Sequence, residues 1–211
     1  MLKKNSLYLL LIITFSFIIY VIYYNFVHDP QAASFLGHKT NLKRPLQIPV
    51  WLNVMYVHVM FACLAMGSGI VNFSSYVFNR FRKFHKVNGY IYIVSLIIVV
   101  ITSGYMAPYA TGGKLASIPF NLLNILWPAM TFIALYHIKK RNMIRHRNWM
   151  FRSYAFCFTN LFIHLITFIS HNAFGITYET SYIYGVYGSF TLLLVLPSLI
   201  LARKKSLFDK F

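Results

Sequence analysis

Histidines are the residues of this sequence best suited to chemistry. The chain has 8 of them among 211 residues, but only 3 Asp and Glu. A neutral imidazole binds metals through either ring nitrogen, and its ordinary pKa lies close to neutral pH. Because carboxylates are so few, the histidines are the main candidates for metal ligands or proton carriers.

Three histidines fall within apolar stretches. His58 lies in the second of six apolar stretches, and His164 lies in the fifth, with His171 seven residues later at its end. About two helical turns separate the latter pair, so they share a face with Asn160 and Thr167. We expect this polar stripe, defined as Asn160, His164, Thr167 and His171, to face the bundle interior or a wet cavity.

Three further histidines, His85, His137 and His146, lie at or just beyond the ends of apolar stretches, among Lys and Arg residues. Imidazole pairs from neighbouring helices can hold the iron of haem b in a membrane, and arginines can bind its propionates. The distribution therefore predicts two haem layers. We expect His58 to pair with His164 in one layer and His85 with His146 in the other, with His171 and His137 as reserve ligands. The residues expected to bind propionates or lipid phosphates are Arg82, Arg147 and Arg152.

Two other functions remain open for the same residues. His85, Arg147 and Arg152 could bind the phosphate of an anionic lipid, as in a non-redox accessory or assembly protein. The polar stripe could instead line the path of a small solute in a channel or transporter. Single histidines could also be structural, with His164 forming a hydrogen bond between helices.

Several other kinds of site are excluded by the residue types present. Asp29, Glu179 and Asp209 are the carboxylate residues, and none lies well inside an apolar stretch. The chain therefore has no carboxylate pair for acid–base catalysis, no acidic Mg²⁺ or Ca²⁺ site and no buried carboxylate relay. It also lacks the H-E-x-x-H, C-x-x-C, Walker and G-x-G-x-x-G motifs. No catalytic set is indicated, and the sequence leaves open whether the protein is an enzyme.

These side chains must be positioned by membrane helices. The chain is 58% hydrophobic and 11% charged, with a mean hydropathy of +0.60, whereas soluble domains have about 25% charged residues. A helix needs about 20 apolar residues to cross the hydrocarbon core. We therefore expect an all-α, polytopic integral membrane protein with a single transmembrane domain over 1–211. Its six expected spans are 6–27, 51–78, 90–108, 119–138, 149–170 and 182–202.

The basic residues predict the orientation of these helices. Lys and Arg total 20, giving a formal net charge of +17. Because they form short clusters between apolar stretches, we interpret them as topology signals and expect no nucleic-acid partner. With the N-terminus inside, only Lys39, Lys43, Arg44 and Lys114 lie outside. Both termini are then cytoplasmic in a multi-pass cell-membrane protein. The expected partners are the bilayer, anionic lipids at the cytoplasmic face, and another membrane protein or a second copy.

Several smaller features concern packing. The first stretch is longer than the apolar core of a signal peptide, so we expect it to be a retained helix. The small residues Gly185 and Ser189 predict a close helix contact, and Cys63 and Cys157 are expected to stay unpaired. The loop at about 28–50 should be irregular. Tryptophans near the span ends should lie at the membrane interface, namely Trp51, Trp127 and Trp149.

A family resemblance rests on the segment 146–155, which reads H-R-N-W-M-F-R-S-Y-A. It resembles the H-R-x-W-M-x-R-S-Y-A signature of an uncharacterised bacterial membrane family, domain of unknown function 2306 (DUF2306). The resemblance covers about 55–165. Other features in the family's order are His58 with Gly67 and Gly69, the basic turn of Arg80, Arg82, His85, Gly89 and Tyr92, and then Ser103-Gly104, Gly112-Gly113 and Trp127.

The resemblance implies how the chain is divided. A first helix and a long outer loop (1–50) precede a four-helix core of helices two to five (51–170), and a sixth helix with a basic tail follows (171–211). Histidines near both faces of such a core are similar to those of diheme transmembrane cytochromes b. The chain departs from the family at Lys86 and Val87, where the family has Arg and Trp, and at His164, where it usually has Arg.

Overall fold

The computed structural model describes residues 4–39 and 45–208, and all regular structure in these residues is helical. Six helical segments in this described part are long and apolar enough to cross a membrane, which confirms the predicted polytopic all-α fold. They are Asn5–His28, Ile48–Asn72, Arg82–Tyr109, Gly113–Lys139, Met143–Phe174 and Tyr178–Arg203. The contacts group the chain into two compact units, Met1–Tyr109 and Ala110–Phe211, each described by itself. A single domain over 1–211 stays a prediction.

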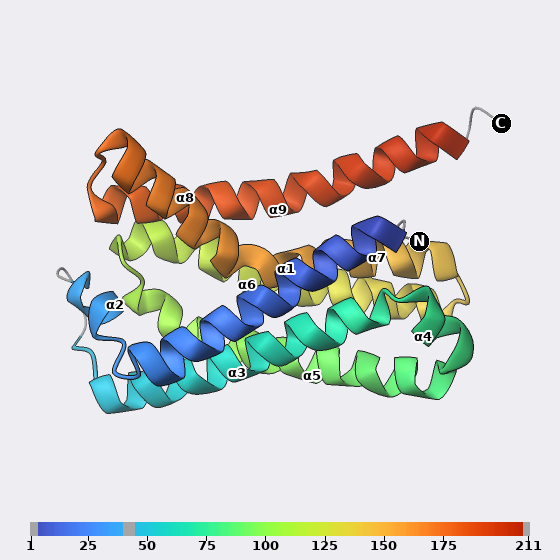
Figure 1. Cartoon of the computed structure of the whole chain (residues 1–211), viewed down its shortest axis with the longest axis horizontal. Coiled ribbons are helices and arrows are strands. Elements are labelled where there is room, and N and C mark those ends of the chain that lie inside the picture. The colour runs from blue at the N-terminus through green and yellow to red at the C-terminus, as the bar shows by residue number, and fades with distance from the viewer. Residues whose placement is uncertain (1–3, 40–44, 209–211) are drawn as a thin grey trace. The chain divides into compact units, whose positions relative to one another are not determined.

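The first unit is built on two long helices packed side by side, α3 (Ile48–Asn72) and α5 (Arg82–Met106). α1 (Lys4–Tyr23) crosses α3 and ends in a π-helical turn, Tyr24–His28 (Figure 1). α5 ends in a 3₁₀ turn, Ala107–Tyr109. The apolar side chains of α1 are largely exposed, with Ile12 at 64% and Ile19 at 68%, as a helix facing lipid requires.

The predicted end of the second span, residue 78, is wrong. α3 stops at Asn72, and Ser74 then begins a separate short helix, α4 (Ser75–Arg80). The Ser74 hydroxyl accepts a hydrogen bond from the backbone N–H of Val77 (3.5 Å), which is the usual role of serine at a helix start. The apolar character of 73–78 concealed this break.

The outer loop is more ordered than the sequence indicated. Residues Ala33–Gly37 form the short helix α2, and both Asp29 carboxylate oxygens accept hydrogen bonds from its first backbone N–H groups (2.8 and 2.9 Å). These two hydrogen bonds lower the pKa of Asp29. Phe35 of α2 stacks on Trp51, which is only 1% exposed. Trp51 is therefore covered by the loop, in the first turn of α3, and its expected position at the membrane interface stays a prediction.

Lys39 fastens the same loop. Its ammonium group donates a hydrogen bond to the carbonyl of Tyr109 and lies over the rings of Phe35 (4.4 Å) and Trp51 (5.3 Å). Burial lowers its pKa from 10.5 to about 8. We call α2, Asp29, Lys39 and the side chains they cover the outer cap.

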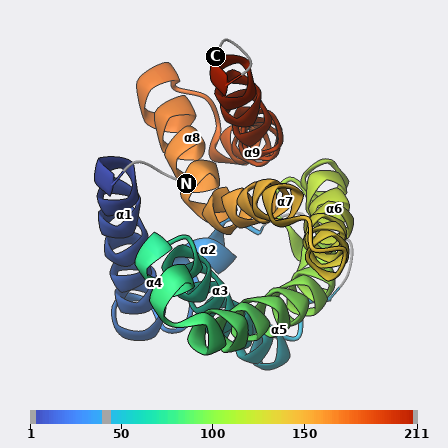
Figure 2. The same cartoon turned by 90° about the vertical axis from the view of Figure 1, so that its right-hand side faces the viewer.

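The second unit contains the remaining spans. α6 (Gly113–Lys139) packs against α7 (Met143–Ala155) and α9 (Tyr178–Phe208), and α8 (Thr159–Phe174) packs against α9 (Figure 2). A 3₁₀ turn, Phe156–Phe158, joins α7 to α8. Trp127 is 4% exposed and lies near the middle of α6, far from the helix ends where an interfacial tryptophan was expected.

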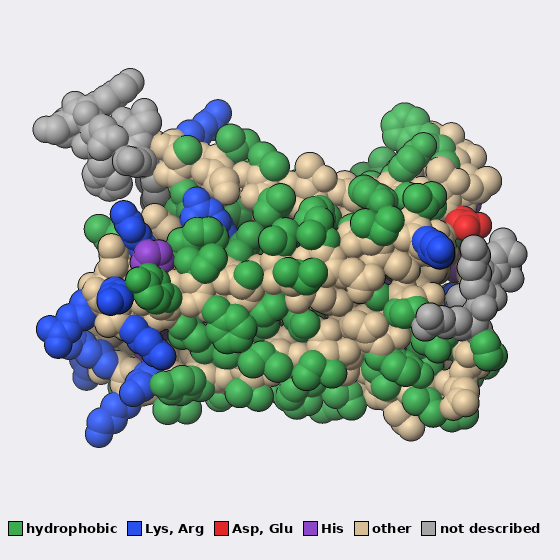
Figure 3. Space-filling model, turned by 180° about the vertical axis from the view of Figure 1, so that it is seen from behind, with side chains coloured by type: hydrophobic (Ala, Val, Ile, Leu, Met, Phe, Trp, Pro, Cys, Tyr) green, Lys and Arg blue, Asp and Glu red, His purple; other side chains and the backbone are tan. Residues whose placement is uncertain are grey.

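The predicted close contact at Gly185 and Ser189 is confirmed. A Cβ added to Gly185 would lie 2.5 Å from the Thr167 hydroxyl oxygen and 2.8 Å from the Ile163 carbonyl oxygen. Ser189 is fully buried. α8 and α9 therefore approach so closely that no larger side chain fits at residue 185. Elsewhere, hydrophobic side chains cover much of the visible surface along the helices (Figure 3).

Candidate functional site

His58 is held by the neighbouring helix of its own unit. It lies half-buried on α3, and its Nδ1 is 2.9 Å from the hydroxyl oxygen of Thr102 on α5. That oxygen is also 2.8 Å from the Ile98 carbonyl, to which the hydroxyl can only donate. When Thr102 donates its single hydrogen there, it accepts from Nδ1–H of His58. The lone pair of a neutral His58 then resides on Nε2.

His146 shows the same arrangement in the second unit. It lies half-buried in the first turns of α7, and its Nδ1 is 2.9 Å from the carbonyl oxygen of Ala134 on α6. A carbonyl only accepts, so Nδ1 carries the hydrogen and Nε2 of the neutral ring carries the lone pair. In this geometry Nε2 can bind a metal.

His85 lies in the first turn of α5, next to a polar network that the sequence reasoning missed. Its ring meets that of Phe78 edge to face, with 5.3 Å between centroids. Its carbonyl accepts a hydrogen bond from the Asn72 amide (3.2 Å), and the Asn72 amide oxygen accepts one from the buried Asn88 (2.9 Å). Asn88 also donates to the Ser68 carbonyl (2.7 Å). A buried asparagine needs hydrogen-bond partners. The presence of Asn72 and Asn88 in or near apolar stretches was therefore the only sequence feature that could have indicated this network.

The polar stripe does not share one environment. Thr167 is buried, and its hydroxyl lies 3.4 Å from the Ser181 carbonyl of α9. Asn160, His164 and His171 are exposed on the surface of the second unit, and the expectation that they face a bundle interior or a wet cavity stays a prediction.

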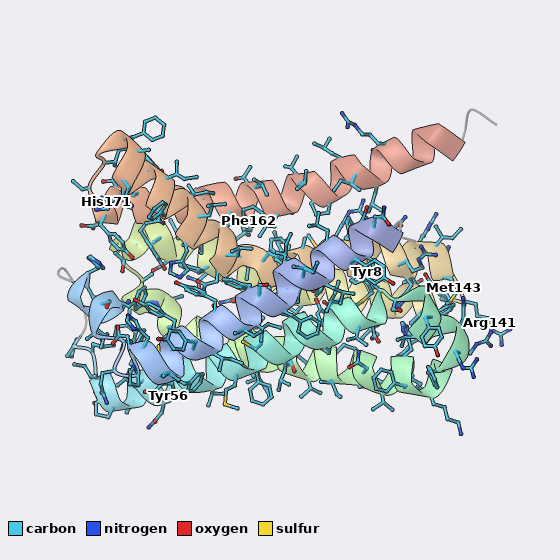
Figure 4. The ribbon with its side chains drawn as sticks, in the orientation of Figure 1. Tyr8, Tyr56, Arg141, Met143, Phe162 and His171 are labelled. Atoms are coloured by element: carbon cyan, nitrogen blue, oxygen red, sulfur yellow. The ribbon has the colours of Figure 1, made fainter. Side chains whose placement is uncertain are left out.

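His171 lies in the last turn of α8 (Figure 4). Its Nδ1 lies 2.7 Å from the carbonyl oxygen of Ile176, and its ring meets Tyr178 edge to face. It therefore fastens the turn between α8 and α9. The other reserve ligand, His137, is half-buried in the last turn of α6, beside the ring of Tyr136.

Of the three candidate arginines, Arg152 is the one with a defined geometry. Its Nε–H donates to the Ser198 hydroxyl of α9 (3.2 Å), and its guanidinium carbon lies 5.0 Å from the centre of the Trp149 ring. Arg152 is half-buried, whereas Arg82 and Arg147 are exposed. Arg141 lies at the exposed turn between α6 and α7, near Met143 (Figure 4).

The candidate ligands are divided between the two units. His58 and His85 belong to the first unit, and His146 and His164 to the second. In the described part of the chain no three His, Cys, Asp or Glu residues gather closely enough to hold a bare metal ion. Cys63 and Cys157 form no disulfide bond in the structure.

Comparison with known proteins gives a family for the chain. The model of the family described as "Predicted membrane protein (DUF2306)" matches residues 55–201. The chain belongs to this family. No curated protein and no solved structure matches it significantly. The DUF2306 match extends past the 55–165 resemblance into α9 and includes every candidate histidine and arginine named above, together with Ser198.

Asn124, also within the DUF2306 match, was missed by sequence reasoning. It lies near the middle of α6, and both its amide nitrogen and its amide oxygen are buried with no hydrogen-bond partner among the described residues. Pro128, four residues later, has no N–H to donate to the Asn124 carbonyl. Proline is tolerated in membrane helices when other groups replace that hydrogen bond. The Asn124 side-chain amide and the Asn124 backbone carbonyl therefore form a polar site inside an otherwise apolar span.

Proposed function

We propose that this membrane protein binds haem b and transfers electrons. The observation that supports this proposal is shared by His58 and His146. In both, Nδ1 is hydrogen-bonded to a neighbouring helix, which leaves Nε2 to bind iron. Metal-binding histidines almost always donate their other ring N–H in this way, because it fixes the tautomer and the ring orientation.

Each side chain has a defined task in this proposal. Thr102 and the Ala134 carbonyl orient the rings of His58 and His146. His58 and His146 are the axial ligands that the geometry supports, His85 and His164 stay candidates from the sequence, and Arg82, Arg147 and Arg152 are available to propionates. Haem would supply the one-electron chemistry, and the helices would set its potential through burial and ligand type.

The location follows the charge pattern. We propose a cell-membrane protein with both termini in the cytoplasm, because the basic clusters then lie inside. The partner that we propose besides the bilayer is an anionic lipid at the cytoplasmic face.

An absorption spectrum of the detergent-purified protein, produced with added haem precursor, tests the haem proposal. We expect a Soret band, with sharp α and β bands after dithionite reduction. His58→Ala and His146→Ala should each lose part or all of these bands. His28→Ala is the control, because His28 is exposed in the turn after α1. A protein that stays colourless with haem supplied, or variants that keep the full spectrum, would overturn the proposal.

A further inference from the structure

The guanidinium of Arg152 is positioned by two contacts. The Ser198 hydroxyl of α9 accepts from its Nε–H, and the Trp149 ring lies against it one turn earlier on α7. Among the described residues no other hydrogen bond or ion pair involves Arg152. A guanidinium has five N–H donors, so its terminal N–H groups remain available to a ligand. Two parallel N–H groups of this kind match the oxygens of a phosphate.

The described part of the chain offers no counter-ion for this half-buried charge. Both Asp29 oxygens bind the start of α2, and Glu179 stands in the first turn of α9, 19 residues before Ser198. That interval is about 28 Å of helix. Asp209 lies outside the described residues. A charge near hydrocarbon is costly without a partner, so Arg152 requires an anion from outside this part of the chain.

Measured from the turn that joins α8 to α9, both helices carry the contact of Arg152 with Ser198 across a similar distance. From Arg152 to the end of α8 at Phe174 is 22 residues, about 33 Å. From the start of α9 at Tyr178 to Ser198 is 20 residues, about 30 Å. Both lengths equal roughly one hydrocarbon thickness, about 30 Å. With that turn at one boundary of the hydrocarbon, the contact between Arg152 and Ser198 falls at the headgroup level of the opposite leaflet, where Trp149 is also well suited.

We propose that Arg152, Ser198 and Trp149 form a binding site for the phosphate of an anionic phospholipid in the cytoplasmic leaflet. The terminal guanidinium N–H groups donate to the phosphate oxygens, while Ser198 and Trp149 fix the guanidinium plane. The inference deepens the lipid partner proposed above, on which it rests. It does not require haem.

Native mass spectrometry of the delipidated full chain, after addition of phosphatidylglycerol or phosphatidylcholine, tests this site. We expect wild type to retain phosphatidylglycerol preferentially and Arg152→Gln to bind it about tenfold more weakly, as expected for losing one bidentate charged contact. Ser198→Ala, which keeps the charge, should lose part of the preference. Arg145→Gln is the matched control, because Arg145 is exposed on the first turn of the same helix.

Three results would overturn the lipid site. The first is equal phosphatidylglycerol binding by wild type and Arg152→Gln, with thermal melting confirming that both are folded. The second is complete displacement of the lipid by millimolar inorganic phosphate, which would identify a free-anion site. The third is unchanged lipid binding with a lost Soret band in Arg152→Gln, which would assign Arg152 to a haem propionate. A colourless wild type that still binds phosphatidylglycerol through Arg152 would contradict only the haem proposal.

Discussion

At the scale of single residues, hydrogen bonds assign different tasks to histidines that look equivalent in the sequence. His171 uses its Nδ1 within the turn that it fastens, whereas His58 and His146 use theirs between helices. Only a ring anchored on a rigid neighbour presents its second nitrogen in a fixed direction. Thr102 is the anchor that can be altered by mutation, since the anchor of His146 is a backbone carbonyl.

Thr102→Val should weaken haem binding by about 10- to 100-fold, the usual cost of removing the hydrogen bond behind a metal ligand. Valine has nearly the same shape but cannot accept from Nδ1–H. Titration of the haem-free protein with haem measures the affinity. Thr102→Ser, which keeps the hydroxyl, should restore it. If Thr102→Val lowers only the melting temperature and leaves the haem titration unchanged, Thr102 has a packing role alone.

Asn124 illustrates what a sequence cannot reveal at this scale. An asparagine in an apolar stretch can equally be satisfied or unsatisfied, and only the surroundings of its amide distinguish the two. Both amide atoms of Asn124 are buried without a partner among the described residues. A polar group without a partner inside a membrane costs free energy.

At the scale of elements, the sequence predicted all six spans because apolar length is a direct requirement of the bilayer. Their ends were less predictable. The helix α5 begins at Arg82 and not near residue 90, since a helix can continue through charged residues at the headgroup level. The break at Ser74 and the helix α2 depend on local hydrogen bonds that hydropathy does not register.

The candidate site was only partly predictable from the sequence, because it too depends on contacts that hydropathy does not register. Residue type identified the histidines and arginines as candidates, but contacts between helices distinguish Arg152 from Arg147. Ser198, which orients Arg152, lies 46 residues away in the sequence. The asparagines of the His85 network were missed because asparagine carries no charge signal and no motif.

Lys39 of the outer cap should make the free energy of unfolding depend on pH. Burial lowers the Lys39 pKa from 10.5 to about 8, so between these pH values the unfolded chain binds more protons than the folded one. Stability conferred by the cap should therefore rise as pH increases from about 8 to 10.5, by on the order of 1–3 kcal/mol. Thermal unfolding of wild type and Lys39→Met in detergent across this range measures it. Parallel pH profiles for the two proteins would contradict the prediction.

At the scale of the whole molecule, the charge distribution predicts an orientation that can be measured directly. In a background with Cys63 and Cys157 replaced by Ala, Lys114→Cys and Arg145→Cys each place a thiol at an exposed residue of the second unit. A maleimide that cannot cross membranes should label Lys114→Cys in intact cells, and Arg145→Cys only after permeabilisation. The reverse pattern would invert the topology and move the Arg152 lipid site to the outer leaflet.

The division of the chain has a consequence for its biogenesis. Each unit contributes three of the six spans found in the described residues, and three is an odd number. A segment with an odd number of spans ends on the opposite side of the membrane from where it began. The second unit therefore starts its insertion from the side opposite to the first. The first span of each unit must therefore insert in the opposite orientation to the first span of the other unit. An inverted first unit would invert the orientation of the second unit as well.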